Sequence, residues 1–432
     1  MFFLFVNILT PMERVKTSSL NELMLYVVFD TLTLCLNPLN SILTGFLGVI
    51  AQFFILMHFE YLPHATSIAA ALFLVRWSFN VIRKPNTTLN IVVSRDHFYL
   101  LRTVLMIPVV ICINMCDYSS IWNVRLSKTS LNGISLMDLG VIGFVFINAF
   151  GRCTPTYKIF SRKIIFLTVL GFIRLFTLFY FNLEAEPTEY GCHLNFYFIL
   201  AALDFLYNLY KKFFRMFYLF DTVIASSILH FYYKYINIDC VFNENRVGLF
   251  MQNKEGFFSL IPLFCLYLII NDFSRKYEFI RFRMIITLIY TTITATLYTY
   301  FTAKQKFPSE KFSYKMFSRI ASSTNDLVKR RSTNFFYISY ALFITFFAFN
   351  FTFILCKIMP AVLINNPLVE FISKNMMLVF LIANIAVLAI KLLKLTEIEG
   401  YNPLKVNITY LFVVFVIVGS LRRLCTRKRI SK

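Results

Sequence analysis

Long apolar runs recur along most of the 432-residue chain, and they constrain its fold more than any other feature. The runs are roughly 17–25 residues long, which is the length that a helix needs to cross the hydrocarbon core of a bilayer. We therefore predict an all-α polytopic membrane protein with about thirteen transmembrane helices (12–13), no soluble domain and a single domain over residues 1–432. The predicted spans are approximately 23–42, 43–60, 65–82, 98–116, 136–150, 163–182, 192–210, 213–233, 256–272, 281–301, 335–357, 368–392 and 406–422.

The chain is strongly basic, with a formal net charge of +21, although 58% of its residues are hydrophobic. In a soluble protein such a charge would indicate nucleic-acid binding. Here the lysines and arginines cluster in short loops between apolar runs, where they set membrane topology and meet anionic lipid headgroups. We therefore expect contact with membrane lipid and no nucleic-acid partner. The nine cysteines and five histidines are scattered without the spacing of a metal site, so no metal is expected.

The basic loops predict how the chain is oriented in the membrane. The connections at 151–162, 211–215 and 273–283 and the tail after residue 421 are rich in Lys and Arg, and the predicted spans place all four on one side. The positive-inside rule makes that side cytosolic. The carboxyl terminus is then cytosolic, and the amino terminus lies on the opposite side. The long basic loop at 302–334 is an exception, because it falls on the non-cytosolic side.

Charged and polar side chains gather at the ends of several predicted spans. Such groups are costly at membrane depth, so they are candidates for function. These groups also have structural interpretations. Asp138 and Glu255 stand where a helix cap is expected, since acids are favoured in the first turn of a helix. Arg174 could extend its charged end toward the membrane interface or pair with another helix, and His193 could be an ordinary packing residue. Together these groups indicate a polar pocket on the non-cytosolic face, where the predicted spans place Asp117, Lys128, Asp138, Glu189, His193, Glu255 and Arg331.

A carboxylate, a lysine and several arginines define the chemistry available in such a pocket. A half-buried carboxylate has a raised proton affinity and can act as a general base on a hydroxyl. A nearby lysine can hold that carboxylate or stabilise a developing oxyanion, and arginines bind phosphate through paired donors. This set fits acyl or glycosyl transfer to a hydroxyl of an anionic lipid. It fits a proton-coupled transporter equally well, so residue chemistry leaves both open.

Four blocks of sequence carry a more specific signal. They read SLMDLGVIGFVF at residues 135–146, TEYGCHLNFY at 188–197, RVGLFMQNKEG at 246–256 and KRRSTNF at 329–335. They resemble the patterns TSLMDLGVGxFVF, TEYGVHWNFF, RVGLxxANREG and, more weakly, SRRxANL of one family. That family is the inositol acyltransferases of glycosylphosphatidylinositol (GPI) anchor synthesis, called GPI-anchored wall transfer protein in fungi and phosphatidylinositol-glycan class W in animals. The blocks follow the family's order within residues 98–345.

The resemblance implies an acyltransferase of the endoplasmic reticulum membrane. Its members transfer a fatty acyl chain from acyl-CoA to the inositol 2-hydroxyl of glucosaminyl-phosphatidylinositol. The implied co-substrate is acyl-CoA, and no cofactor and no obligate protein partner are implied. The active site is expected near the lumenal face.

The resemblance also implies roles for individual residues. Asp117 and Lys128 form the implied catalytic pair, although the segment between them departs from the family pattern. Asp117 would deprotonate the hydroxyl, and Lys128 would orient Asp117 and help to neutralise the tetrahedral intermediate. The implied substrate-binding residues are Arg125, Asp138, Arg174, Glu189, His193, Asn195, Asn253, Glu255 and Arg331.

Two other functions stay open. A lipid or solute transporter or flippase would predict an inverted repeat and broken helices near the middle of the membrane, and the sequence shows no internal repeat. A membrane-bound O-acyltransferase of the other type would rely on a buried histidine, for which only His193 and His230 are placed.

Overall fold

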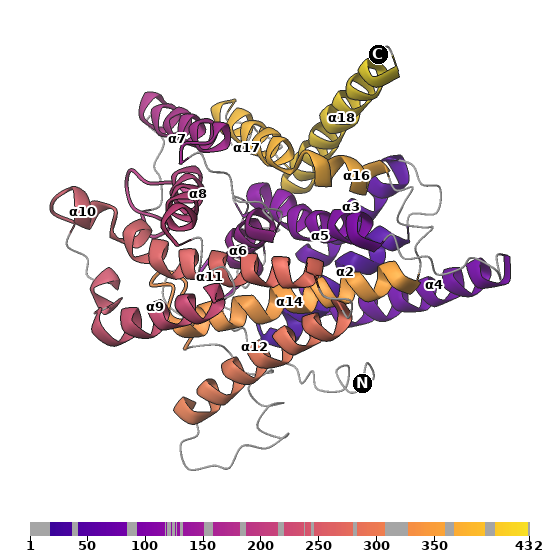
Figure 1. Ribbon diagram of the computed structural model, residues 1–432. Helices are drawn as coiled ribbons and strands as arrows, with labels where there is room; N and C mark the ends of the chain where they lie inside the picture. The colour runs from indigo at the N-terminus through magenta and orange to yellow at the C-terminus, as the bar shows by residue number, and fades with distance from the viewer. Residues whose placement is uncertain are drawn as a thin grey trace. The chain divides into compact units, whose positions relative to one another are not determined.

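The computed structural model consists of helices and connecting turns (Figure 1). It describes residues 18–36, 42–83, 93–116, 118, 122, 126, 128–129, 133–150, 159–181, 187–214, 220–236, 238–242, 246–279, 283–306, 327–358, 367–393 and 402–430. Within these ranges the chain forms no strand, and its one β-bridge joins Gly133 and Lys329. Two predicted site residues, Asp117 and Arg125, lie outside the described residues.

The apolar helices confirm an all-α polytopic membrane protein. Among the described residues, four helices are long and apolar enough to cross a membrane: His97–Met115, Arg162–Tyr180, Lys254–Tyr277 and Phe335–Ile358. Two bent helix pairs raise that number to as many as six. The helix predicted at 213–233 is shorter than expected, because it begins at Asp221, ends at Tyr235 and has 15 residues. The total of about thirteen therefore stays a prediction.

The chain divides into two compact units. Unit 1 contains Met1–Ser127, Ser135–Gly140 and Phe347–Lys432, and unit 2 contains Lys128–Ile134 and Val141–Phe346. The prediction of a single domain over residues 1–432 stays a prediction.

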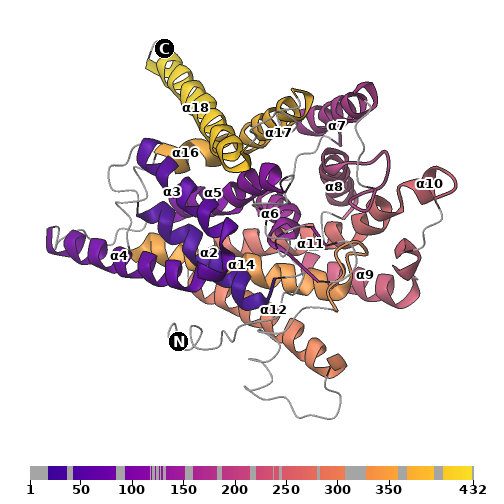
Figure 2. The ribbon, with the colours of Figure 1, turned by 180° about the vertical axis from the view of Figure 1, so that it is seen from behind.

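Unit 1 is built around helix α5 (Val93–Met115), which contacts α2 (Leu20–Cys35), α3 (Ile42–Met57), α16 (Pro367–Lys374), α17 (Met376–Leu392) and α18 (Pro403–Ile430). Helix α4 (Leu62–Arg83), which follows the short 3-10 helix η1 (Phe59–Tyr61), lies beside α2 (Figure 2). Buried polar contacts fix α18 on α5, since Asn114 donates to Asn407 at 2.8 Å and Tyr410 donates to the carbonyl of Val110 at 2.8 Å. Such pairs satisfy polar groups that would otherwise be costly in an apolar interior.

Unit 2 is built around helix α11 (Lys254–Phe279). It contacts α8 (Phe196–Phe213), α9 (Asp221–Tyr235), α12 (Arg283–Lys306), α10 (Leu249–Gln252) and the 3-10 helix η4 (Ile238–Phe242). Helices α6 (Leu136–Phe150) and α14 (Phe335–Ile358) each contribute one part to this unit, from Val141 onward and up to Phe346. Helix α11 carries ion pairs near both of its ends, through Glu255 at the start and through Asp272 and Arg275 near the end.

Helix α7 (Arg162–Tyr180) packs on α8 through a glycine. A Cβ on Gly171 would lie 2.7 Å from the ring of Phe198, so this approach requires glycine. On its other face the aromatic residues are exposed, as with Phe176 at 67% and Phe179 at 81%. Only 22% of the residues in this apolar helix are buried within the protein, which is the pattern of a helix that faces lipid.

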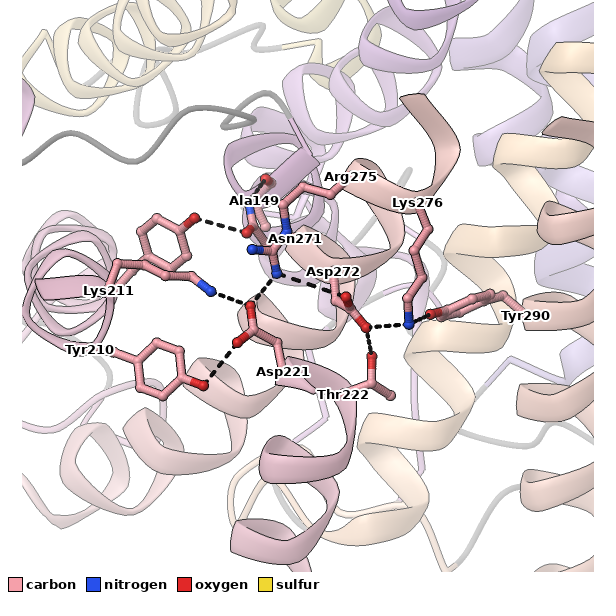
Figure 3. Close-up of polar contacts among 11 residues, drawn as sticks. Ala149, Tyr210, Lys211, Asp221, Thr222, Asn271, Asp272, Arg275, Lys276 and Tyr290 are labelled. Carbon is pink, nitrogen blue, oxygen red and sulfur yellow. Dashed lines mark hydrogen bonds and ion pairs between the residues drawn. The ribbon is translucent and has the colours of Figure 1, made fainter. Parts of the chain in front are cut away.

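The C-terminal part of α11 carries a buried network of ion pairs (Figure 3). The carboxylate of Asp221, at the start of α9, accepts from Tyr210 at 2.8 Å and also pairs with Lys211 and Arg275. Asp272 pairs with Lys276 at 2.8 Å and lies 3.8 Å from the guanidinium of Arg275. We call these groups the α11 ion network. It joins α8, α9 and α11 through charges that are buried and paired.

Next to the α11 ion network, side chains of α11 satisfy the carbonyl end of α6. Asn271 donates to the carbonyl of Ala149 at 3.1 Å, and Ser274 donates to that of Phe150 at 2.7 Å. Tyr207 of α8 donates to Asn271 at 2.8 Å. The last carbonyls of a helix have no partner within it, so a buried helix end needs donors of this kind.

Candidate functional site

A polar cavity lies in unit 2, and its empty volume is about 280 Å³, which includes space open to solvent. Its walls come from five segments: α6, the turn at 187–190, α11, the turn at 327–334 and the first turn of α14. The lining residues are Val141, Glu189, Tyr190, Ser259, Leu263, Arg330, Arg331, Thr333 and Tyr337. The cavity therefore combines charged groups and hydroxyls with the apolar side chains of Val141 and Leu263.

Glu189 is the carboxylate in the wall of the cavity, and it forms an ion pair with Lys128. Burial alone would raise its pKa, but the charges of Lys128 and Arg330, and the more distant Arg174, outweigh that effect and lower the pKa below its ordinary value of 4.5. The carboxylate is therefore ionised at neutral pH. This electrostatic environment connects three residues that the sequence predicted, Lys128, Arg174 and Glu189, with Arg330.

The lowered pKa of Glu189 predicts how stability depends on pH. A carboxyl whose pKa is lower in the folded than in the unfolded chain stabilises the fold at every pH above the unfolded value. That contribution is lost as the pH falls below 4.5 and passes through the lower folded pKa. We expect the difference in unfolding temperature between wild type and Glu189→Gln to be constant from about pH 8 to about pH 5 and to shrink in more acid solution. A difference that grows toward acid pH would contradict the pairing with Lys128.

Glu255, in the first turn of α11, holds two arginines. Its carboxylate is fully buried and accepts from Arg246 at 2.5 Å and 3.2 Å and from Arg331 at 2.8 Å and 3.2 Å. A carboxylate at a helix N-terminus is also favoured by the helix dipole. Glu255 therefore lies in the first turn of α11, where an acid is favoured, and the same carboxylate orients Arg331 in the cavity wall.

The segment at 187–195, which contains Glu189, is fixed against the start of α11. Cys192 donates to the carbonyl of Gln252 at 2.9 Å, and Gly256 donates to that of Tyr190 at 3.1 Å. Gly191 has φ +105°, and a Cβ there would lie 2.4 Å from the Cα of Asn253. Both the backbone conformation and the close approach require glycine at this position.

The turn at 327–334 presents the two arginines of the cavity. The side chain of Asn334 accepts from the backbone N–H of Tyr337 at 3.0 Å, which caps α14. It also accepts from the backbone N–H of Lys329 at 3.2 Å, which closes the turn. Thr333 adopts φ +47°, which is unusual for a β-branched residue. Tyr233 donates to its carbonyl at 2.7 Å and stabilises that conformation.

The structure brings five of the predicted site residues into one cluster and places the others differently. Glu189 and Arg331 line the polar cavity, Lys128 and Glu255 pair with them, and the charge of Arg174 acts on Glu189. The remaining described residues that were predicted are Asp138, His193, Asn195 and Asn253.

Two of these remaining residues cap helices. In unit 1, Asp138 accepts from the backbone and hydroxyl of Ser135, each at 3.0 Å, and Ser135 accepts in return from the backbone of Asp138, which is the reciprocal pattern of a capping box at the start of α6. Asn195 is the N-cap of α8 and also donates to the carbonyl of Gly171 at 2.9 Å. Their predicted roles in the sugar pocket stay predictions, and a structural role is now visible for each.

Several cavity residues were not singled out in the sequence. Arg330 lies beside the predicted Arg331 in the block at 329–335, and its charge lowers the pKa of Glu189. Ser259 lies four residues after Glu255, so helical spacing could have identified it. Tyr190 adjoins Glu189 in a block that the sequence had already marked. Thr333 lies in the block at 329–335 that the sequence had marked, whereas Leu263 and Tyr337 lie outside the four blocks.

The helices and the charged cavity define the class of protein, a multi-pass helical membrane protein with a polar site built from the ends of its helices. A family model named GWT1 matches residues 1–421, and the chain belongs to the GWT1 family.

Individual relatives match shorter segments. A GPI-anchored wall transfer protein 1 from Kluyveromyces lactis is 32% identical over 181 residues, covering 39% of this chain and 40% of the relative. Proteins of the same name from Candida albicans and Schizosaccharomyces pombe are 27% and 25% identical, over 60% and 61% of this chain. Those alignments cover 61% and 63% of the relatives, so each of the three spans less than two thirds of the protein it matches.

Proposed function

We propose that this chain is an acyltransferase of GPI-anchor biosynthesis in the membrane of the endoplasmic reticulum. It transfers a fatty acyl chain from acyl-CoA to the inositol 2-hydroxyl of glucosaminyl-phosphatidylinositol. Membership of the GWT1 family supports the pathway, since the relatives carry the name GPI-anchored wall transfer protein 1. The carboxyl terminus is cytosolic in this proposal, and the site opens toward the lumen.

The charge of the polar cavity is the observation that carries the proposal. Two carboxylates, Glu189 and Glu255, interact with a larger number of described cations, namely Lys128, Arg174, Arg246, Lys254, Arg330 and Arg331. An excess of cations favours an anionic ligand, and guanidinium groups suit the oxygens of a phosphodiester. The hydroxyls of Ser259, Thr333 and Tyr337 in the wall add partners for a polyol. A phosphoinositide headgroup combines these two features.

The proposed chemistry is the addition of a hydroxyl to a thioester. Asp117 takes the proton of the inositol hydroxyl while the hydroxyl oxygen of the inositol bonds to the carbonyl carbon of the thioester. Lys128 stabilises the oxyanion of the tetrahedral intermediate. The carbon–sulfur bond then breaks, the thiolate of CoA leaves, and the proton on Asp117 returns to solvent or to that sulfur. Acyl-CoA supplies the activated acyl group, so the protein needs no further cofactor in this scheme.

A mechanism based on a buried histidine receives no support from the two residues considered for it. The side chains of His193 and His230 are exposed. The buried His97 of unit 1 is held by the carbonyl of Phe349 at 3.1 Å and by the rings of Phe349 and Phe353.

Complementation tests the proposal. The chain is expressed in a yeast strain that lacks its own inositol acyltransferase, and the lipids are extracted and analysed. We expect growth and the appearance of acylated glucosaminyl-phosphatidylinositol, neither of which an empty vector restores. Correctly inserted protein that yields no acylated lipid would overturn the proposal. Accumulated but unmodified glucosaminyl-phosphatidylinositol on the wrong side of the membrane would instead favour a transporter.

A further inference from the structure

Asn253, at the junction of α10 and α11, uses its whole side chain within the protein. Its oxygen accepts from the backbone N–H of His193 at 2.8 Å and of Leu194 at 3.0 Å. Its nitrogen donates to the carbonyl of Leu249 at 2.9 Å and lies 3.2 Å from Nδ1 of His193. A carboxamide has two acceptor positions and two N–H donors, so all four are occupied.

These contacts also fix which ring nitrogen of His193 carries the proton when the imidazole is neutral. Because the oxygen of Asn253 faces two N–H groups, its nitrogen must face Nδ1 of His193. Nδ1 is then the acceptor, and the ring proton of neutral His193 is on Nε2. With both hydrogens engaged and only 3% of the residue exposed, the Asn253 side chain has no capacity left for a substrate. The predicted substrate-binding role of Asn253 is therefore better explained by an indirect effect than by a direct contact.

The contacts of Asn253 belong to a tight junction between residues 190–194 and 252–256, which we call the clasp. Two backbone hydrogen bonds, from Cys192 to Gln252 and from Gly256 to Tyr190, lie beside the carboxamide. A Cβ on Gly256 would lie 2.7 Å from the carbonyl oxygen of Tyr190. The two backbones therefore approach more closely than any residue with a side chain would permit at this position.

The clasp adjoins both carboxylates of the site. Glu189 directly precedes Tyr190, and Glu255 directly precedes Gly256, the two residues that the clasp joins at 3.1 Å. Glu189 holds Lys128, and Glu255 holds Arg331. The positions of these two ion pairs relative to each other thus depend on the register of the clasp, and the carboxamide of Asn253 makes side-chain contacts that fix this register.

We propose that Asn253 is a positioning residue, which holds Glu189 and Glu255 at the separation that the anionic headgroup requires. This inference rests on the proposed function for the identity of the headgroup. It predicts a selective effect on the glycolipid, because the clasp adjoins the carboxylates that hold two of the cations proposed to bind the headgroup, Lys128 and Arg331. A displacement of about 1 Å in such a group can cost as much as 10²-fold in rate.

The experiment compares Asn253→Ala with wild type in two measurements. Hydrogen exchange on the purified full-length chain reports the protection of the amides at 190–194 and at Gly256. Steady-state kinetics with glucosaminyl-phosphatidylinositol and palmitoyl-CoA report a KM for each substrate. We expect faster exchange at the clasp and a KM for the glycolipid raised about tenfold or more, with the KM for palmitoyl-CoA within about twofold of wild type.

Two further variants separate positioning from general damage. Asn208→Ala removes another buried carboxamide of unit 2, which donates to the carbonyl of Ile159 at 3.1 Å, and should leave both KM values unchanged. Asn253→Asp keeps the oxygens that accept from His193 and Leu194, so it should retain most of the protection and fold even if the alanine variant does not. In that variant the KM for the glycolipid should lie between those of wild type and Asn253→Ala.

Three outcomes would overturn the inference. They are unchanged exchange at the clasp in Asn253→Ala, faster exchange with no change in the glycolipid KM, and equal increases in both KM values. If wild type itself transfers no acyl group, the proposed function fails first. Two measurements then still decide the inference. The first is the hydrogen exchange of Asn253→Ala and Asn253→Asp. The second is the binding of glucosaminyl-phosphatidylinositol, measured as added protection of the amides at 188–190.

Discussion

Replacing Lys128 by methionine is expected to lower inositol acylation by about 10²–10³-fold while the protein still folds. The change removes the ammonium that pairs with Glu189 at the edge of the cavity and keeps a side chain of similar length. Arg330 and Arg174 still act on Glu189, so its carboxylate keeps cations nearby and the site does not lose all of its charge balance. The measurement is acylated product per unit of membrane-inserted protein, from wild type and variant microsomes.

A double-mutant cycle decides whether Lys128 acts on the reacting atoms or only through Glu189. If the lysine served only as the counterion of Glu189, then Lys128→Met would have no further effect in a Glu189→Gln background. We expect a loss of similar size in both backgrounds, because the proposed role of Lys128 is to stabilise the oxyanion. Lys374→Met is the matched control, since Lys374 forms an exposed pair with Glu370 in unit 1. Additional loss below about twofold in the Glu189→Gln background would remove Lys128 from the chemistry.

The membrane class and part of the site could be predicted from the sequence. Apolar runs identify spanning helices because the bilayer leaves few other solutions. The positions of Glu189, Glu255 and Arg331 could be grouped in advance, since loops on one membrane face lie near one another whatever the helix packing. The structure agrees in that Glu255 pairs with Arg331 and both Glu189 and Arg331 line one cavity.

The roles of the asparagines could not be predicted. Asn195 and Asn253 each directly precede a helix, which is the position of a cap and also of a ligand contact. Only the direction of the carboxamide distinguishes these roles, and that direction depends on a backbone far away in sequence, such as Gly171 for Asn195 or His193 for Asn253. A single sequence contains the residue types but not these long-range partners.

The basic residues near the C-terminal end of α11 show a second limit. Lys211, Arg275 and Lys276 were interpreted as topology signals, which assumes that they face lipid headgroups or water. In the structure Lys211 and Arg275 are buried against Asp221, a carboxylate that had no assigned role (Figure 3). Counting charges by loop cannot reveal such pairs, because an acid on a neighbouring helix converts a surface charge into part of a buried network.

Replacing Asp221 by alanine is therefore expected to destabilise the protein by about 3–5 kcal/mol. The carboxylate is fully buried and accepts from Tyr210, Lys211 and Arg275, and the last two are cations that are themselves buried. Its removal leaves two positive charges close together in an apolar interior, with Asp272 as the nearest remaining acid at 3.8 Å from Arg275. The cost comes mainly from these uncompensated cations, and not from the loss of attractive energy alone.

The matched control is Glu370→Ala, which breaks the exposed pair with Lys374 and should cost less than about 1 kcal/mol. Both free energies are measured by reversible unfolding in mixed micelles with increasing sodium dodecyl sulfate. Equal small losses would show that the network is solvated in the membrane-inserted protein. A double change of Asp221→Ala with Arg275→Met should recover part of the stability, because it removes one of the two buried cations that lose Asp221. A double variant less stable than Asp221→Ala alone would contradict that explanation.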